Sequence, residues 1–489
     1  MKPVLAAILG LLFLGATPAT PPGPATKRGA ALTDALRQAT RGDKLVAWVF
    51  FTDKGTAAEV RAAQARTYMT PRAASRRRLR GQVSGPTVQD LPLAAAYVDR
   101  VAASVARVRQ RSRWLNAVSV EATLAQLETI EALPFVARLD VVRRYRRRND
   151  ERAGEPDAAV RSASPARKAS ATAIDYGASA GQLAQIGVPA VHEMGFHGEG
   201  VVVAVFDTGF NSLNHEVFSS MRIVAVRDFV NGDDDVSDGS DQGDGSHGTM
   251  TLSALGGRQE GQLVGPAFAA EFILAKTENT ASETPVEEDN WAAAAEWAES
   301  LGADVISSSL GYLEYDSPFP SYSFRDMNGQ TAISTRAAEM AAARGVVVVA
   351  SAGNSGPNAE HNTLGAPSDG AHVLAIGAVG STGARASFSS VGPSADGRTK
   401  PDLAAQGQSV RVAFPGSVSR YTTANGTSFS CPLTAGVVAL LLQVNPGASP
   451  DDVAGVLRAT ASQAGAPDNL LGWGIVDART AAAGWGATP

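Results

Sequence analysis

The stretch that decides the fold is Val-Val-Val-Ala-Val-Phe-Asp-Thr-Gly, residues 201–209 of a chain of 489 residues. Its first six residues are all apolar and mostly β-branched, which is typical of a strand buried on both faces of a parallel sheet. An acidic residue, Asp207, follows this run without a break. Because ligands of open parallel sheets bind where strands end and loops begin, Asp207 is either a group that orients another residue at a functional site or an ordinary turn or N-cap residue.

Strands and helices of this kind alternate through the rest of the C-terminal part. The further predicted strands are Ile223–Val226, Phe272–Ala275, Val305–Ser309, Val346–Ser351 and Val373–Val379, and the predicted helices include Trp291–Ser300 and Ala332–Arg344. This alternation predicts an α/β domain over residues 174–485. Its sheet is expected to be doubly wound and mostly parallel, with helices on both faces.

Three other polar segments carry residues with chemical potential. They are GSHGT at 245–249 with His247, AGNSG at 352–356 with Asn354, and GTSFSCP at 426–432 with Ser428. A buried helix is predicted at Leu433–Val444, with Pro432 in its first turn, so Ser428 is expected at a helix N-terminus. Each of these residues alone also fits an ordinary role in a turn, a core or an N-cap.

Taken with Asp207, the three residues are the parts of a nucleophilic catalyst. Ser428 would attack a carbonyl, His247 would take its proton, and Asp207 would hold the histidine tautomer and stabilise the imidazolium. The side-chain amide of Asn354 and the backbone N–H of Ser428 would donate to the developing oxyanion. The sequence therefore predicts a serine nucleophile at the carboxyl edge of the sheet.

The order Asp, His, Asn, Ser and its surroundings resemble the subtilisin-like serine peptidases, or subtilases. The matching stretches are VAVFDTG around Asp207, HGT at His247, SAGNSG at Asn354 and GTSFSCP at Ser428. The resemblance implies a subtilisin-like fold and a serine endopeptidase that acts on peptide and protein substrates, with no organic cofactor. The segment 305–311 is similar to the family's peptide-pairing strand. The residues expected to bind substrate are Ser309, Leu310, Gly311, Ala352 and Gly353.

Two other functions remain open at this point. A catalytically silent relative could bind peptides without cleaving them, although all four catalytic positions are occupied. An esterase could use the same triad, although the peptide-pairing segment favours peptide substrates. The chain is expected to act as a monomer.

The extreme N-terminus has the pattern of a secretory signal. Met1-Lys2-Pro3 precedes the apolar run Val4–Leu14, and small residues follow it. A signal peptide is therefore predicted at residues 1–20, with export to the exterior or the periplasm and no membrane association after its removal.

The region 27–148 predicts a small α+β domain. Lys44–Phe51 and Asn116–Glu121 have strand composition, and Thr123–Leu133 has helical spacing with a capping box from Thr123 to Gln126. By position it resembles a subtilase propeptide, which implies a folding assistant and intramolecular inhibitor. Residues 149–173 have the composition of a linker. The processing site is expected either at Arg146–Arg148, directly before the linker, or by autocleavage within it.

The net charge of −5 hides a division between the two parts of the chain. Residues up to Lys168 carry +15 and the remainder −20. Parts of opposite sign attract each other, so the basic part is expected to dock on the acidic one. Nucleic acid is not an expected partner, because the arginines are scattered among apolar segments with few aromatic residues.

Two minor features complete the expectations. Acidic residues crowd a loop before His247 and are weak candidates for calcium ligands, namely Asp233, Asp235, Asp238 and Asp241. The single cysteine, Cys431, excludes an intramolecular disulfide and is expected to be a buried apolar filler.

Overall fold

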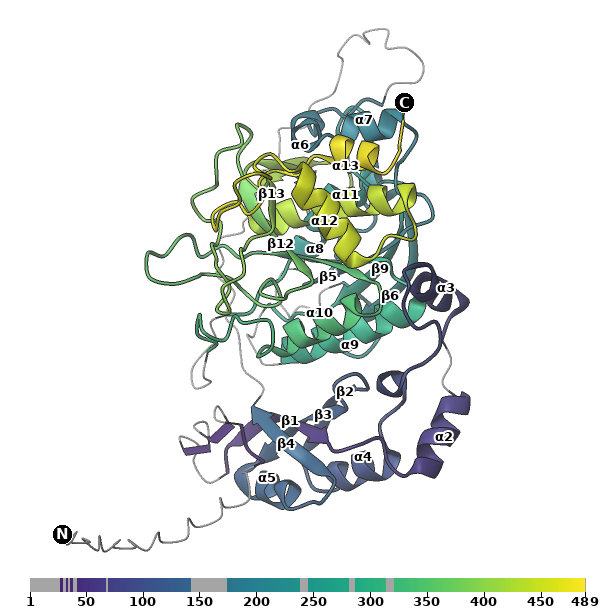
Figure 1. Ribbon diagram of the computed structural model, residues 1–489, viewed down its shortest axis with the longest axis vertical. Coiled ribbons are helices and arrows are strands. Elements are labelled where there is room, and N and C mark those ends of the chain that lie inside the picture. The colour runs from purple at the N-terminus through teal and green to yellow at the C-terminus, as the bar shows by residue number, and fades with distance from the viewer. Residues whose placement is uncertain are drawn as a thin grey trace, which may run out of the picture.

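The computed structural model describes residues 27–29, 32–33, 36–37, 42–66, 69–141, 174–237, 245–280, 286–313 and 321–488. They form a small N-terminal domain packed against a larger one (Figure 1). The predicted signal peptide at 1–20, the Arg146–Arg148 run and the linker at 149–173 lie outside the described residues.

The small domain is built on an antiparallel sheet of four strands in the order β2-β3-β1-β4. The strands are β1 (Lys44–Phe51), β2 (Arg107–Ser112), β3 (Ala117–Thr123) and β4 (Val136–Val141). The helices are α2 (Ala57–Arg66), α3 (Pro71–Leu79), α4 (Ala95–Ala102) and α5 (Leu124–Glu131), with the 3-10 turn η1 (Val88–Asp90). Thr123 and Gln126 each accept the other's backbone N–H at the start of α5, which confirms the predicted capping box.

The large domain contains a sheet of seven strands in the order β13-β12-β11-β10-β5-β9-β6, and every neighbouring pair is parallel. These strands are β5 (Val202–Asp207), β6 (Arg222–Asp228), β9 (Glu271–Lys276), β10 (Val305–Ser308), β11 (Val347–Ser351), β12 (Val373–Val379) and β13 (Leu403–Gln406). The predicted parallel sheet is therefore confirmed.

Strand β5 shows why the sheet is covered on both faces. Val203 and Val205 point into one hydrophobic core, which they share with helices α8 (Ser246–Gly256) and α11 (Thr427–Val444). Ala204 and Phe206 point into the other core, with α9 (Val286–Leu301) and α10 (Ile333–Ala342). Successive side chains of a strand face opposite sides, so a continuous apolar run requires helices on both.

Strand β1 explains in the same way how the two domains join. Ala47 and Val49 face the small domain's own core, whereas Val46, Trp48 and Phe50 belong to the core that contains α9 and α10. The sheet of the small domain therefore lies with one apolar face on these two helices, which are sandwiched between the two sheets (Figure 1).

The remaining elements of the large domain are short or peripheral. They are α6 (Ala180–Gln185), α7 (Val188–Glu193), η2 (Glu216–Phe218), β7 (Arg258–Gln259), β8 (Leu263–Val264), β14 (Val410–Ala413), β15 (Tyr421–Ala424), α12 (Pro450–Thr460) and α13 (Ala478–Gly484). By length and composition α11 alone among the described helices could cross a membrane, but 89% of it is buried within the domain, as expected of a core helix.

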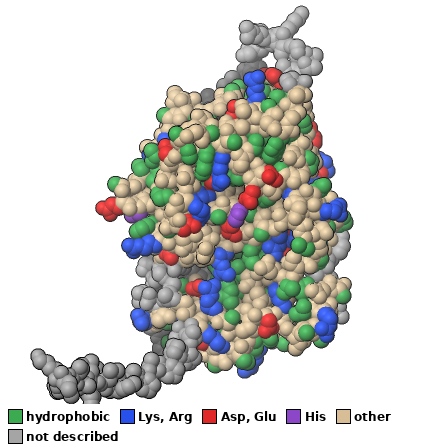
Figure 2. Space-filling model, in the orientation of Figure 1, with side chains coloured by type: hydrophobic (Ala, Val, Ile, Leu, Met, Phe, Trp, Pro, Cys, Tyr) green, Lys and Arg blue, Asp and Glu red, His purple; other side chains and the backbone are tan. Residues whose placement is uncertain are grey.

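On the visible face of the molecule (Figure 2), the charge division of the sequence does not appear as two surfaces of opposite sign. On the face shown in Figure 2, basic and acidic side chains are interspersed over both domains. Part of the charge is instead buried where the domains meet, as the ion pair between Arg76 and Glu299 shows.

Candidate active site

The predicted catalytic residues lie at the carboxyl edge of the large sheet. Asp207 ends β5, and His247 and Ser428 are the second residues of α8 and α11. Asn354 follows the end of β11. Residues separated by more than 200 positions are thus brought to one region by the parallel strand order.

Asp207 and His247 are joined directly. The Nδ1 atom of His247 lies 2.6 Å from Oδ1 of Asp207, and both side chains are buried. A carboxylate at this distance requires the proton on Nδ1, so the other ring nitrogen, Nε2, is the basic atom of the neutral ring. Glycine at position 248 lets the start of α8 lie close to the backbone that follows Asp207, because a Cβ atom at position 248 would lie 2.2 Å from the carbonyl oxygen of Gly209.

Two further donors hold the Asp207 carboxylate. The backbone N–H of Thr208 donates to Oδ1 and the hydroxyl of Thr251 donates to Oδ2, each at 2.8 Å. Thr251 lies four residues after His247, so both side chains project from the same face of α8. Sequence reasoning missed Thr251, although its spacing from His247 was the available signal.

Ser428 lies against the end of β10 and beside α8. Its hydroxyl donates to the carbonyl oxygen of Ser309 at 3.1 Å. The ring centroid of Phe429, the next residue, is 5.7 Å from that of His247. The position of Ser428 at the start of α11 confirms the expected helix N-terminus, where the helix dipole favours a developing negative charge.

The start of α11 corrects one expectation. The helix begins at Thr427, so Pro432 lies inside it and not in its first turn. A proline at this position has no N–H to donate to the carbonyl of Ser428, four residues earlier. The hydroxyl of Ser309 donates to that carbonyl at 2.8 Å and replaces the missing helical bond.

The side chain of Asn354 is oriented by Thr427. Its Oδ1 accepts the backbone N–H and the hydroxyl of Thr427, each at 2.9 Å, which directs the amide nitrogen away from Thr427. The left-handed position of this turn is Gly353, with φ of +113°. The orienting role of Thr427 was not predicted, although the residue stands directly before Ser428.

The predicted substrate segment follows two neighbouring strands. Ser309, Leu310 and Gly311 continue β10, and Ala352 and Gly353 continue β11. The hydroxyl of Ser351 donates to the carbonyl of Leu310 at 3.0 Å and ties the two extensions together. Gly311 and Gly353 are only half-buried, so backbone is accessible at this edge.

The calcium and cysteine expectations have different outcomes. Asp233 and Asp235 lie on an exposed loop and accept backbone N–H groups of that loop, whereas Asp238 and Asp241 lie outside the described residues. The described residues contain no cluster of three or more His, Cys, Asp or Glu side chains that could hold a metal. Calcium binding stays a prediction. Cys431 is fully buried, as expected, and burial raises the pKa of its thiol to about 12.

The sequence and fold of the chain match known peptidases. The subtilase family matches residues 198–474, and the peptidase S8 propeptide domain of Bacteroidota matches residues 46–156. Subtilisin Savinase of Lederbergia lenta is 33% identical over 299 residues, which cover 61% of this chain and 97% of that protein. Serine protease AprX of Bacillus subtilis is 32% identical over 316 residues, which cover 59% and 67%.

Two solved structures share the fold. Fervidolysin from Fervidobacterium pennivorans, described as a keratinolytic enzyme related to subtilisin, aligns with 91% of this chain and 62% of its own, at a TM-score of 0.63 and 21% identity. A protease from Pseudoalteromonas arctica aligns with 64% of this chain and 99% of its own, at 0.52 and 25%. Because the family match covers more than half of the chain, this chain belongs to the subtilase family, as a subtilisin-like serine endopeptidase with a propeptide domain.

Proposed function

We propose that the chain is exported and cleaves peptide bonds through Ser428, His247 and Asp207. Ser428 attacks the scissile carbonyl carbon while Nε2 of His247 takes the hydroxyl proton. The same nitrogen then returns the proton to the leaving amine, and water repeats the sequence on the acyl-enzyme. Asp207 holds the histidine tautomer and stabilises the imidazolium.

The observation that carries this proposal is the 2.6 Å contact between the buried Nδ1 of His247 and Oδ1 of Asp207. It supports a role for His247 as a base, because it leaves the lone pair on Nε2. The contacts of Asn354 with Thr427 support a second role, in which the Asn354 amide and the Ser428 N–H bind the oxyanion.

Peptide substrate is proposed to pair with Ser309–Gly311 and with Ala352–Gly353. Both are backbone extensions of central strands, and an added strand gains main-chain hydrogen bonds whatever its side chains. The chemistry requires no organic cofactor. The small domain is proposed to act as folding assistant and inhibitor until the chain is cut in the linker at 149–173.

A fluorophosphonate probe tests the nucleophile. The processed wild-type protein should be labelled and should hydrolyse a peptide substrate, whereas Ser428→Ala should do neither. Labelling that persists in Ser428→Ala would contradict the proposal. Correctly processed wild type that stays unlabelled would indicate a silent peptide-binding relative. Turnover of esters without peptides would indicate an esterase.

N-terminal sequencing of the culture supernatant tests export and processing together. The mature protein is expected outside the cytoplasm and to begin within or just after residues 149–173. A protein that stays in the cytoplasm with Met1 intact would contradict the proposed export.

A further inference from the structure

Helix α3 contacts the large domain at a place away from the sheet of the small domain. It lies apart from that domain's sheet and against the large domain, near one end of α9 (Figure 1). Arg72 of α3 donates to the carbonyl oxygens of Gly200 at 2.8 Å and Gly302 at 3.1 Å. These two glycines stand shortly before β5 and β10, so α3 binds the amino ends of the central strands.

The position of α3 separates it from the catalytic edge. Asp207 and Ser309 stand at the carboxyl ends of the same two strands, and β5 and β10 are parallel. A strand of six residues spans about 20 Å at its usual rise. The helix therefore cannot reach substrate or the catalytic residues, and its contact must serve another purpose.

The large domain offers carboxylates and backbone carbonyls to α3, and α3 offers guanidinium groups. Arg76 pairs with the carboxylate of Glu299 and donates to the carbonyl of Ala303 at 2.6 Å. Arg77 lies between Glu299 and Asp90 of its own domain, with each pair at 2.9 Å. The side chains of Arg76 and Arg77 are only 2% exposed.

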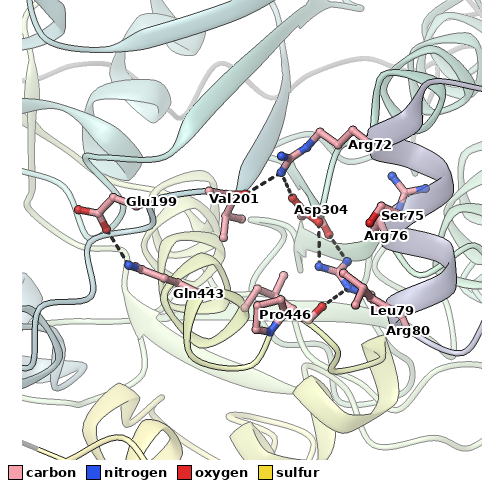
Figure 3. Close-up of a pocket in the computed structure, with 12 residues that line it drawn as sticks. Arg72, Ser75, Arg76, Leu79, Arg80, Glu199, Val201, Asp304, Gln443 and Pro446 are labelled. Carbon is pink, nitrogen blue, oxygen red and sulfur yellow. Dashed lines mark hydrogen bonds and ion pairs between the residues drawn. The ribbon is translucent and has the colours of Figure 1, made fainter.

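Asp304 is the second carboxylate of the large domain that binds arginines from α3 and the residue after it. Its carboxylate accepts Arg72 on one oxygen and Arg80, the residue after α3, on the other (Figure 3). Arg80 also donates to the carbonyl of Gly345, which precedes β11. We call this surface the amino-edge site, defined by the carboxylates of Glu299 and Asp304 and the carbonyls of Gly200, Gly302, Ala303 and Gly345.

We propose that the amino-edge site is a second propeptide-binding site, selective for guanidinium groups, that retains the small domain on the peptidase after the linker is cut. This rests on the proposed function only in treating the small domain as the inhibitor. The two carboxylates and the carbonyls of the site can only accept hydrogen bonds. The planar guanidinium group of Arg supplies several N–H donors in a fixed geometry. Replacing one partner of a buried pair leaves the other charge buried and uncompensated, so a substitution in these pairs should weaken docking of the small domain.

A matched pair of variants tests the site. Arg76 and Arg78 belong to the same helix, but Arg78 is exposed, and among the described residues its side chain bonds to Ser75 of α3. Arg76→Gln and Arg78→Gln each remove one positive charge. General attraction between a basic and an acidic domain predicts equal effects, whereas the amino-edge site predicts an effect for Arg76→Gln alone.

The measurement uses the full chain in an inactive form. Ser428→Ala is combined with a recognition sequence for a site-specific protease placed within 149–173, and the protein is immobilised by its C-terminus and cut. Release of the small domain is then followed over time. Compared with the cut Ser428→Ala protein that carries no further substitution, Arg76→Gln is expected to release the small domain on the order of 100-fold faster. Arg78→Gln is expected to release it at an unchanged rate.

A second variant guards against a misfolded protein. Arg72 is 38% exposed, so Arg72→Gln is the milder change and should also accelerate release, by about tenfold. Equal release rates for Arg72→Gln, Arg76→Gln and Arg78→Gln would overturn the proposal. The release assay does not depend on peptidase activity, so a negative result would overturn only the proposal for the amino-edge site. Peptide hydrolysis by Ser428→Ala would instead overturn the proposed function.

Discussion

The Asp207 carboxylate is held by three donors that come from three different residues. His247 and the N–H of Thr208 bind one oxygen, and the hydroxyl of Thr251 binds the other. A carboxylate bound on both oxygens cannot rotate about its Cβ–Cγ bond. Thr251 therefore acts as a positioning residue, since it fixes the plane in which Asp207 meets the imidazole.

Replacing Thr251 by Val should lower kcat without changing KM. The variant keeps the shape of the side chain but removes a hydrogen bond to a charged group, which is typically worth about 1.5–3 kcal/mol. We expect kcat to fall by about tenfold or more, because Thr251 acts on the imidazole and not on substrate binding. Steady-state kinetics with a peptide substrate measures both constants.

The conservative variant separates positioning from packing. Thr251→Ser keeps the hydroxyl and loses a methyl group, so it should retain most of the activity while it loses some stability. If Thr251→Val keeps the wild-type kcat, or if Thr251→Ser is equally slow, the positioning role is wrong.

At the scale of single residues, the sequence identifies the reacting groups better than those that hold them. Asp207, His247 and Ser428 stand in recognisable local surroundings. The hydroxyls of Ser309 and Thr427 bond to residues that are distant in sequence, such as Ser428 and Asn354. Such pairs depend on which strand ends meet, and this is set by tertiary packing.

Helix α11 shows how one element depends on another. Its internal Pro432 leaves the carbonyl of Ser428 without a helical donor, and the hydroxyl of Ser309, at the end of β10, supplies one. The element that carries the predicted nucleophile is thus bonded to the strand that carries the predicted substrate segment. This contact fixes the start of α11 against the sheet.

This dependence predicts coupling between Ser309 and Pro432. In the inactive Ser428→Ala background, Ser309→Ala should reduce the free energy of unfolding by about 1 kcal/mol, because a buried carbonyl loses its donor. In a Pro432→Ala background the restored N–H can serve that carbonyl, so the same change should cost less. Urea denaturation of the four proteins gives the coupling energy, and simple additivity would contradict the assignment.

At the scale of elements, strands were easier to predict than helix ends. The runs at 202–207 and 347–351 are buried on both faces, and their composition alone indicates this. The sequence predicts a later start for α11 than Thr427, where the helix begins, because a proline usually marks the first turn of a helix. Here a side chain from another element compensates for the proline, which no local pattern reveals.

In the whole molecule, the charge division of the chain becomes a set of specific contacts between its domains. The values of +15 and −20 predict attraction but not its location. One group of contacts lies at the amino-edge site. Another lies where the sheet of the small domain covers α9, and there two carboxyl groups, Asp289 and Glu296, are buried against hydroxyls of β2 and β3.

These two carboxyl groups should make propeptide release depend on pH. Burial between the domains raises the pKa of Asp289 to about 8, and it also raises the pKa of Glu296. In the separated peptidase both would face water, with ordinary values near 4. A group with a raised pKa in the complex favours docking at low pH, and this contribution is lost as the pH rises through about 8.

Release of the small domain is therefore expected to accelerate between about pH 4 and pH 8, by up to about tenfold per pH unit for each proton that docking takes up. Asp289→Asn removes one such group but keeps an amide beside Ser119, so its release rate should rise less steeply. The cut, immobilised Ser428→Ala protein gives both profiles without interference from proteolysis. Parallel profiles would contradict this prediction and show that Asp289 is ionised in the complex, where the positive charge of Arg109 opposes the rise of its pKa. A flatter profile for Asp289→Asn would instead place one pH-sensitive step of activation at this single carboxyl group.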